Sequence, residues 1–380
     1  MQWSLFLLLL MGQSFFLTCG LYEFHFINVN KTWEEAQAYC RESYTDLAKV
    51  FDLTDMRRLQ SSTQYKGEAW IGLYSKPGKE NRTWHWSLPG VEEYSEKQYS
   101  DSKSWWGTNE PNDGGGTQNC ENSQSCQNCV FTTGNWVDDP CSHTKWFICY
   151  DETMKNNKTF HVIYENKNWT QAQSYCRVNH TDLVSGLHQI NSTEFKELNR
   201  SAGFWIGLFR DTWRWSDGSK FSFRHWDMDS FNDGLSTEEC ATTLLDRSGR
   251  WSSDGCNQTK PFFCYEDKVI LIKESRTWEE ALYYCREKHH DLVSISSSQQ
   301  QGWVQEKAKN ASTPFVWLGL RYTCTLGFWF WVTDETVTYN NWDSNSTDDC
   351  NMSGAMASAG SHAWSRQPDD GMFNFFCSKY

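Results

Sequence analysis

The same pattern of apolar positions occurs three times along the chain. In each copy a tryptophan, an alanine and a cysteine stand at positions i, i+3 and i+7, which share one face of an α-helix. The three sets are Trp33, Ala36 and Cys40; Trp169, Ala172 and Cys176; and Trp278, Ala281 and Cys285. A helix-capping residue precedes each tryptophan, and a Glu or Gln stands three residues after the capping residue, as in Thr32 with Glu35. The pattern therefore predicts three equivalent helices, each carrying a buried cysteine.

Other features recur in the same order around each predicted helix. A short strand-like run precedes the helix, and an Asp-Leu pair, a Trp-Ile/Leu-Gly-Leu segment, a Trp-X-Trp segment and a single tryptophan follow it. The Trp-Ile/Leu-Gly-Leu segments lie at 70–73, 205–208 and 317–320, and the Trp-X-Trp segments at 84–86, 213–215 and 329–331. Each copy closes on an apolar strand with Cys149, Cys264 or Cys377. We predict three tandem domains, at 21–150 (repeat 1), 158–265 (repeat 2) and 268–380 (repeat 3), with the Trp-X-Trp residues in their cores.

The N-terminal residues predict export. Residues 1–20 contain an apolar run from Leu5 to Met11 and small residues near Gly20, so we interpret them as a signal peptide. Of the 15 cysteines one lies in this stretch, which leaves an even number for disulfide bonds. Eleven Asn-X-Ser/Thr sites are candidate glycosylation acceptors. We expect a secreted, extracellular glycoprotein without a membrane span, because no other run approaches the roughly 20 apolar residues that a membrane helix needs.

Charge and motif content exclude several functional classes. The formal net charge of −13 argues against nucleic acid and anionic membranes as partners. No nucleophile, zinc-protease or phosphate-loop motif occurs, and we predict no enzymatic activity. The ten histidines show no metal-ligand spacing, and the adjacent pair His289-His290 fits a solvated helix end. Cys126 and Cys129 have the spacing of a redox pair but lack its strand–helix–strand context.

The helix with Trp and Cys, the Trp-Ile-Gly-Leu segment and the closing Phe-Ile-Cys strand together resemble the C-type lectin-like domain. The resemblance covers essentially the whole chain after residue 20. Three such domains in tandem are similar to the secreted multi-domain lectins of fish and to the repeats of the macrophage mannose receptor. The resemblance implies an α+β fold, with two helices and small antiparallel sheets per domain and a long irregular loop that carries the ligand sites.

We also expect a disulfide pattern of the kind that this family has. The closing cysteine of each copy should pair with its helix cysteine, which gives Cys40–Cys149, Cys176–Cys264 and Cys285–Cys377. The inner bridges should be Cys129–Cys141 and Cys240–Cys256, with Cys120–Cys126 as an extra bridge in a loop inserted in repeat 1 and Cys324–Cys350 as the remaining pair of repeat 3.

Repeat 1 retains part of the calcium and sugar site of the family. Calcium-binding members carry Glu-Pro-Asn, then a Glu before an inner cysteine, then Trp-Asn-Asp, because calcium prefers six to eight oxygen ligands. Glu110-Pro111-Asn112 matches the first element, and a cis bond before Pro111 would turn both neighbouring side chains toward one point. Asp138 matches the last position. The resemblance implies that Glu110, Asn112 and Asp138 bind both carbohydrate and Ca²⁺.

Two departures weaken this calcium site. A glutamine stands before the inner cysteine, whether Gln118 or Gln127 is the equivalent, and Val137 replaces the asparagine of Trp-Asn-Asp. We expect calcium affinity on the order of millimolar, or none. Trp105 next to the loop could stack on a sugar or be partly buried beside Trp106.

Repeats 2 and 3 lack this set of predicted calcium and sugar ligands. Repeat 2 has Asn232 without Glu-Pro before it and Glu238-Glu239 before Cys240, which we interpret as a solvated acidic loop. In repeat 3, Asn345-Ser346-Thr347 replaces Glu-Pro-Asn, and Arg366 stands where a carboxylate is needed.

Three hypotheses about function follow. The first is a secreted lectin that binds glycans or glycoproteins, of mannose type, through repeat 1 with weak calcium dependence; the resemblance implies a role in innate defence. The second is an array of calcium-independent modules that bind protein ligands. The third is an ice- or mineral-surface binder on the same scaffold.

Overall fold

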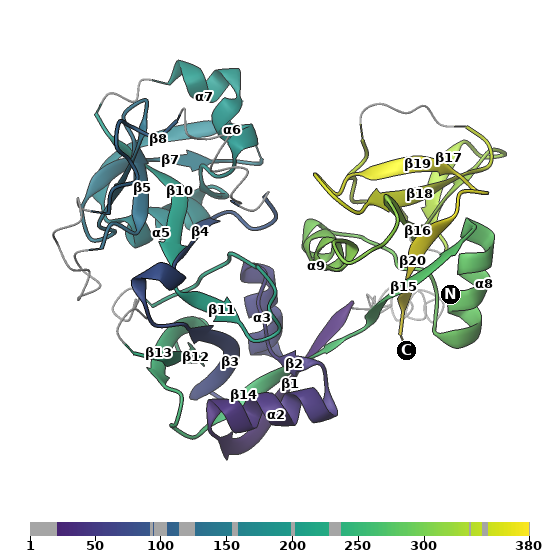
Figure 1. Ribbon diagram of the computed structural model, residues 1–380, viewed down its shortest axis with the longest axis horizontal. Helices are drawn as coiled ribbons and strands as arrows, with labels where there is room; N and C mark the ends of the chain where they lie inside the picture. The colour runs from purple at the N-terminus through teal and green to yellow at the C-terminus, as the bar shows by residue number, and fades with distance from the viewer. Residues whose placement is uncertain are drawn as a thin grey trace, which may run out of the picture.

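The computed structural model describes residues 21–91, 94, 105–113, 126–153, 159–198, 202–227, 237–333, 336–343 and 349–379. Its helices and strands gather into three bodies, each built around one antiparallel-rich sheet with helices against it (Figure 1). The predicted α+β class is confirmed. Within the described residues, no helix has the length and apolar character needed to span a bilayer.

Body I consists of residues 21–75 and the described part of residues 213–267. Its elements are β1 (Tyr22–Lys31), α2 (Trp33–Ser43), β2 (Asp46–Leu47), α3 (Leu53–Ser61), β3 (Glu68–Ser75), β11 (Trp213–Trp215), β12 (Glu239–Leu244), β13 (Arg250–Gly255) and β14 (Lys260–Asp267). The sheet order is β1-β14-β3-β12-β13, with β11 beside β3 and β2 beside β14.

Body II consists of the described part of residues 83–211, and the short 3₁₀ helix η1 (Lys79–Asn81) precedes it. Its elements are β4 (Thr83–Trp86), β5 (Cys129–Thr132), β6 (Trp136–Asp139), β7 (Lys145–Tyr150), β8 (Phe160–Lys167), α5 (Trp169–Asn179), β9 (Asp182–Leu183), α6 (Leu187–Asn191), α7 (Thr193–Glu197) and β10 (Phe204–Asp211). The sheet order is β6-β5-β10-β7-β8, with β4 beside β10 and β9 beside β7.

Body III consists of the described part of residues 269–379 and lies within repeat 3. Its elements are β15 (Val269–Arg276), α8 (Trp278–Lys288), α9 (Ser298–Ala308), β16 (Phe315–Thr323), β17 (Phe328–Trp331), β18 (Met352–Ala357), β19 (Trp364–Pro368) and β20 (Phe373–Ser378). The sheet order is β15-β20-β16-β18-β19, with β17 beside β16.

The three predicted helices form as the sequence indicates. Each begins with a two-way capping box, in which the capping side chain accepts from the third helical N–H and the Glu or Gln side chain accepts from the cap N–H. The Trp, Ala and Cys of each set are buried against the sheet. The indole N–H of Trp33 donates to the carbonyl of Ile71 over 2.9 Å, and Trp169 and Trp278 make the equivalent bonds. These contacts fix each helix on the strand that carries the Trp-Ile/Leu-Gly-Leu segment.

Repeats 1 and 2 exchange halves between bodies I and II. After β3 the chain leaves body I, forms body II with the described part of residues 83–211, and returns to body I at β11. The outgoing and returning segments are adjacent, since the Lys76 N–H donates to the carbonyl of Thr212. In body I, β1 of repeat 1 therefore pairs with β14 of repeat 2, with His25 opposite Cys264. In body II, β10 of repeat 2 pairs with β4, β5 and β7 of repeat 1.

Two predicted outer disulfides are wrong for this reason. The structure pairs Cys40 with Cys264 and Cys149 with Cys176, in place of Cys40–Cys149 and Cys176–Cys264. Both bonds have a Cα–Cα separation of 5.3 Å, within the usual range. Because both repeats carry the same helix and the same closing strand, each helix finds an equivalent partner in the other repeat, which is the condition for element exchange.

The other predicted bridges within the described residues are confirmed. They are Cys129–Cys141, Cys240–Cys256, Cys285–Cys377 and Cys324–Cys350. Cys120 lies outside the described residues. Since Cys129 pairs with Cys141, the Cys126–Cys129 spacing is not a redox pair.

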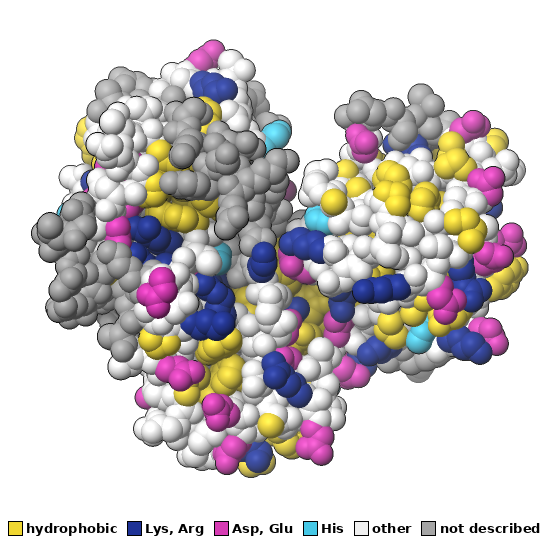
Figure 2. Space-filling view, in the orientation of Figure 1, with side chains coloured by type: hydrophobic (Ala, Val, Ile, Leu, Met, Phe, Trp, Pro, Cys, Tyr) yellow, Lys and Arg dark blue, Asp and Glu magenta, His cyan; other side chains and the backbone are white. Residues whose placement is uncertain are grey.

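The bodies also contact one another through apolar groups. Trp303 of α9 in body III stacks on Tyr22 of body I with ring centroids 3.7 Å apart, and Lys49 of body I lies 4.3 Å above the Trp303 ring. A single cluster of buried residues spans both bodies. Figure 2 shows basic and acidic side chains interspersed over bodies I and III on the face drawn, without a large area of one sign.

Candidate functional site

The predicted Glu-Pro-Asn segment forms a turn on the surface of body II. The Glu110–Pro111 bond is cis, which is the geometry that would turn both neighbouring side chains toward one point. The Asn112 side-chain amide donates to Glu110 Oε1 over 2.8 Å, and the Asn112 backbone N–H donates to Glu110 Oε2 over 3.2 Å. Glu110 is half-buried and Asn112 is exposed, so both polar groups border solvent.

Asp138 lies beneath this turn and is 1% exposed. It is part of β6, whose pairing with β5 places Val130 opposite it. Its Oδ1 accepts from the Asn112 N–H over 3.0 Å, and its Oδ2 accepts from the Asp113 N–H over 3.0 Å. The structure therefore brings the three predicted ligands, Glu110, Asn112 and Asp138, together.

Two arginines that sequence reasoning missed complete this cluster. Arg210 of β10 donates from Nη2 to Asp138 Oδ2 over 2.8 Å and to Asp113 Oδ1 over 2.9 Å. Arg82 donates from Nη2 to Asp113 Oδ2 over 2.6 Å and from Nη1 to Asn128 Oδ1 over 2.6 Å. Arg210 belongs to repeat 2, so no pattern within repeat 1 could have indicated it.

The charges of the cluster nearly balance. Asp113 and Asp138 pair with the guanidinium groups of Arg82 and Arg210, and Glu110 adds one further carboxylate. Partial burial, and then the hydrogen bond and negative charge of Asp138, raise the pKa of Glu110 to about 7. Burial and the nearby charge of Arg82 lower the pKa of Arg210 to about 10, so it stays cationic at neutral pH.

This arrangement fits calcium poorly. Calcium prefers six to eight oxygens, whereas Asp138 Oδ2 already accepts from Arg210 and the Gln127 carbonyl accepts from the same guanidinium over 2.9 Å. Val137 offers no side-chain oxygen. The Glu110 and Asn112 side chains border solvent, where a polar ligand would meet their carboxylate and amide groups.

The equivalent positions in the other bodies do not form such a cluster within the described residues. In body I, Glu239 begins β12, and its Oε1 accepts from the Thr237 hydroxyl over 3.2 Å. In body III, the Arg366 guanidinium lies 4.4 Å from the Trp342 ring centroid. Gln118, Asn232 and Asn345-Ser346-Thr347 lie outside the described residues.

Trp105 and the tryptophans of the Trp-X-Trp segments lie in or beside the cores of the three bodies. Trp105 is half-buried and stacks on the buried Trp136 with centroids 6.2 Å apart, which agrees with its packing alternative. Of the Trp-X-Trp residues, Trp86, Trp213, Trp215 and Trp331 are buried, while Trp84 and Trp329 pack at the edge of the cores. Their placement in the core is therefore largely confirmed.

Comparisons with known proteins agree with this fold. The family model for the lectin C-type domain matches three times, over residues 29–151, 165–266 and 274–379. Human C-type mannose receptor 2 is 25% identical over 371 residues, which cover 86% of this chain and 25% of the receptor. The secretory phospholipase A2 receptor of Pongo abelii is 21% identical over 384 residues, which cover 83% of this chain and 24% of that receptor. The chain thus spans about a quarter of the length of these relatives.

Similar solved structures cover smaller parts of the chain. Human lithostathine matches 29% of this chain and 81% of its own, with 23% identity and a TM-score of 0.27. The carbohydrate-recognition domain of cow CD23 matches 30% of this chain and 90% of its own, with 24% identity and a TM-score of 0.27. Since the family model matches most of the chain in three consecutive copies, this protein belongs to the C-type lectin domain family.

Proposed function

We propose that this protein is a secreted lectin whose body II binds glycans of mannose type through Glu110 and Asn112, with little dependence on calcium. The observation that carries the proposal is the surface turn on which these two side chains adjoin, supported from below by Asp138. Carboxylate and amide groups side by side can hydrogen-bond to neighbouring sugar hydroxyls. The relationship to a mannose receptor supports the choice of ligand class.

The weak role of calcium follows from the arginines. A calcium ion at Asp138 would have to compete with Arg210, which is only 12% exposed and already neutralises that carboxylate. Below about pH 7, protonation of Glu110 removes another negative charge. A divalent cation therefore gains less from this cluster than from one that lacks arginines. Glycan recognition of this kind would suit a role in innate defence.

The same arginines favour a second candidate function, an array that binds a protein ligand without calcium. A cluster in which carboxylates already pair with guanidinium groups has little need of a metal to neutralise it. One relative is named as a receptor for a secretory phospholipase A2, which is itself a protein.

Calorimetry on the full chain separates the two candidates. Methyl α-mannoside is titrated first in a chelator and then in excess calcium, with wild type and Glu110→Gln. The lectin hypothesis predicts binding in both solutions, with affinities that differ by less than about threefold, and a loss of binding in the variant. No heat in either solution would eliminate glycan binding of this type and leave the protein-binding candidate. Binding that requires calcium would contradict the proposed role of Arg210.

A further inference from the structure

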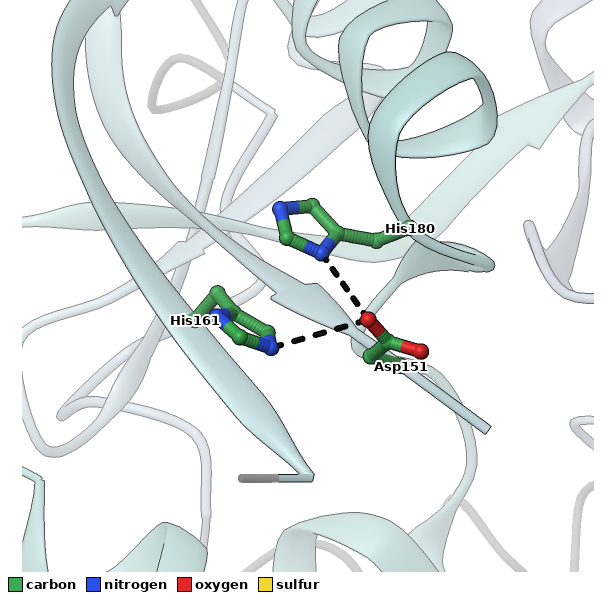
Figure 3. Close-up of side chains that lie close together, drawn as sticks. All are labelled: Asp151, His161 and His180. Carbon is green, nitrogen blue, oxygen red and sulfur yellow. Dashed lines mark hydrogen bonds and ion pairs between the residues drawn. The ribbon is translucent and has the colours of Figure 1, made fainter. Parts of the chain in front are cut away.

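A second group of polar side chains converges in body II, on residues different from those of the glycan site. Figure 3 shows His161 and His180 directed at the carboxylate of Asp151. His180 Nδ1 lies 3.2 Å and His161 Nε2 lies 3.7 Å from Asp151 Oδ2. The three ligand atoms all lie within 4.8 Å of one another. From this geometry we propose that Asp151, His161 and His180 bind a divalent transition-metal ion of the zinc type.

No sequence pattern indicates this group, because its members are far apart in the chain. His161 follows Asp151 by 10 residues and His180 by 29, so no short metal-binding motif is present. The spacing of the histidines along the sequence therefore gives no sign of this pair. The fold brings them together: their rings stack with centroids 4.2 Å apart.

The three side chains are held by a rigid part of body II. The Cys149–Cys176 disulfide joins β7 to α5. Asp151 stands two residues after Cys149, His161 lies opposite Cys149 on β8, and the His180 N–H caps α5 by donating to the Cys176 carbonyl. Such a site needs little rearrangement to accept an ion, which favours binding.

The donor set selects the class of metal. Two imidazoles and one carboxylate suit zinc and its neighbours, whereas calcium requires oxygen ligands. The 3.2 Å between His180 Nδ1 and Asp151 Oδ2 is close to the roughly 3.3 Å expected between ligands in a tetrahedral zinc site. His161 Nε2, at 3.7 Å from the same oxygen, would move inward to close the site around an ion. A water molecule would supply the fourth ligand, as in other sites with three protein ligands.

Thr153 orients the carboxylate. Its N–H donates to Asp151 Oδ1 over 2.9 Å, and its hydroxyl donates to the same oxygen over 2.5 Å. Asp151 itself is 1% exposed, and the side chains of His161 and His180 are 15% and 13% exposed. The hydrogen bonds to Oδ1 turn Oδ2 toward the two imidazoles, which is the arrangement that outer-shell partners of metal ligands provide.

The other two bodies serve as internal comparisons. At the positions of Asp151, His161 and His180, body I has Glu266, His25 and Tyr44, and body III has Lys379, Ile270 and His289. In body I, Glu23 joins His25 and Glu266, but this group has one imidazole, and the glutamate side chains are 56% and 35% exposed. In body III a lysine replaces the carboxylate. Only body II thus has two imidazoles and a buried carboxylate at these positions.

The test is a Co²⁺ titration of the full chain, purified without a histidine tag, followed by visible absorption and by competition with Zn²⁺. We expect one tightly bound equivalent with the spectrum of nitrogen–oxygen coordination, displaced by zinc and removed by a chelator. His161→Ala and His180→Ala should each weaken binding by roughly 100-fold, and Thr153→Val by roughly tenfold. The matched control His25→Ala should bind as wild type does.

Folding of the variants is checked by circular dichroism and by disulfide content. Thr153→Val leaves the three ligands in place, so it tests the site even if a histidine variant misfolds. The proposal is overturned if folded His161→Ala and His180→Ala bind cobalt as wild type does. It is also overturned if Glu266→Ala, and not Asp151→Ala, abolishes binding, because the histidines would then face the carboxylate of the other closing strand.

Discussion

Arg210 donates a hydrogen bond to Asp138 over 2.8 Å, although the two residues belong to different sequence repeats. The position equivalent to Arg210 in repeat 1 is Ser75, five residues after the first tryptophan of the same segment. In body I, Ser75 accepts from the Glu239 N–H over 2.8 Å. The exchange of halves therefore decides whether a cation or a hydroxyl lies beside the buried aspartate, and with it the calcium chemistry of the site.

Arg210→Ala should convert the cluster into a better calcium site. Without the guanidinium, Asp138 loses the cation that compensates its buried charge, and the free energy of unfolding in a chelator should fall by about 3 kcal/mol. Added calcium should restore part of this loss, because it binds the native state. Denaturant unfolding with and without calcium measures both effects. Arg321→Ala, which removes a more exposed ion pair with Asp369 in body III, is the control and should show no calcium response.

Val137→Asn should strengthen calcium binding further. The asparagine adds a side-chain oxygen in β6 next to Asp138, and amide oxygens are ligands that calcium accepts. We expect a gain of about tenfold in calcium affinity in the Arg210→Ala background, measured by calorimetry. The equivalent change in body I, Ser252→Asn, lacks a neighbouring aspartate and should have no effect. An unchanged affinity in the Val137 variant would mean that the turn holds the new side chain away from the ion.

The pKa of Glu110 predicts a pH dependence. Because it is raised to about 7, the folded protein binds more protons than the unfolded one between about pH 4.5 and 7. The contribution of Glu110 to stability is therefore present at low pH and is lost as the pH rises through 7. Calcium binding has the opposite trend, since it needs the ionised carboxylate. Glu110→Gln should flatten both profiles between pH 5 and 8; profiles that match wild type would assign the dependence to another group.

Removal of the Cys149–Cys176 disulfide should destabilise body II. The bond closes a loop of 27 residues, and the chain-entropy model gives about 3.5 kcal/mol for a loop of that length. The double variant Cys149→Ser with Cys176→Ser should unfold at correspondingly lower denaturant concentration, and it should also bind cobalt less tightly. The control pair is Cys324→Ser with Cys350→Ser in body III, which should leave cobalt binding unchanged.

Local features of this protein could be predicted from its sequence because they depend on neighbouring residues. The capping boxes, the buried face of each helix and the cis bond before Pro111 arise from short segments. The approach of Glu110, Asn112 and Asp138 could be inferred from the family resemblance. These contacts form within one repeat, so they are the same whether or not repeats 1 and 2 exchange halves.

The exchange could not be predicted, because it depends on a choice between nearly identical partners. The helix of Cys40 can pack against the closing strand of Cys149 or of Cys264, since both strands carry the same apolar pattern. Where the chain passes between bodies I and II, Arg224 forms a buried ion pair with Asp211, and His85 lies 3.5 Å from the same carboxylate. Burial acts to raise the pKa of Asp211, but the charges and hydrogen bonds of Arg224 and His85 together outweigh burial and hold this pKa well below its usual range. Arg210 beside Asp138 and the Asp151–His161–His180 group both follow from this choice.

Disulfide mapping of the purified protein tests the exchange most directly. Digestion without reduction, followed by mass spectrometry, should yield peptides linked through Cys149–Cys176 and Cys40–Cys264, as in the structure. Peptides linked through Cys40–Cys149 and Cys176–Cys264 would contradict the exchange, and with it the pairing of Arg210 with Asp138 and the proposed metal site.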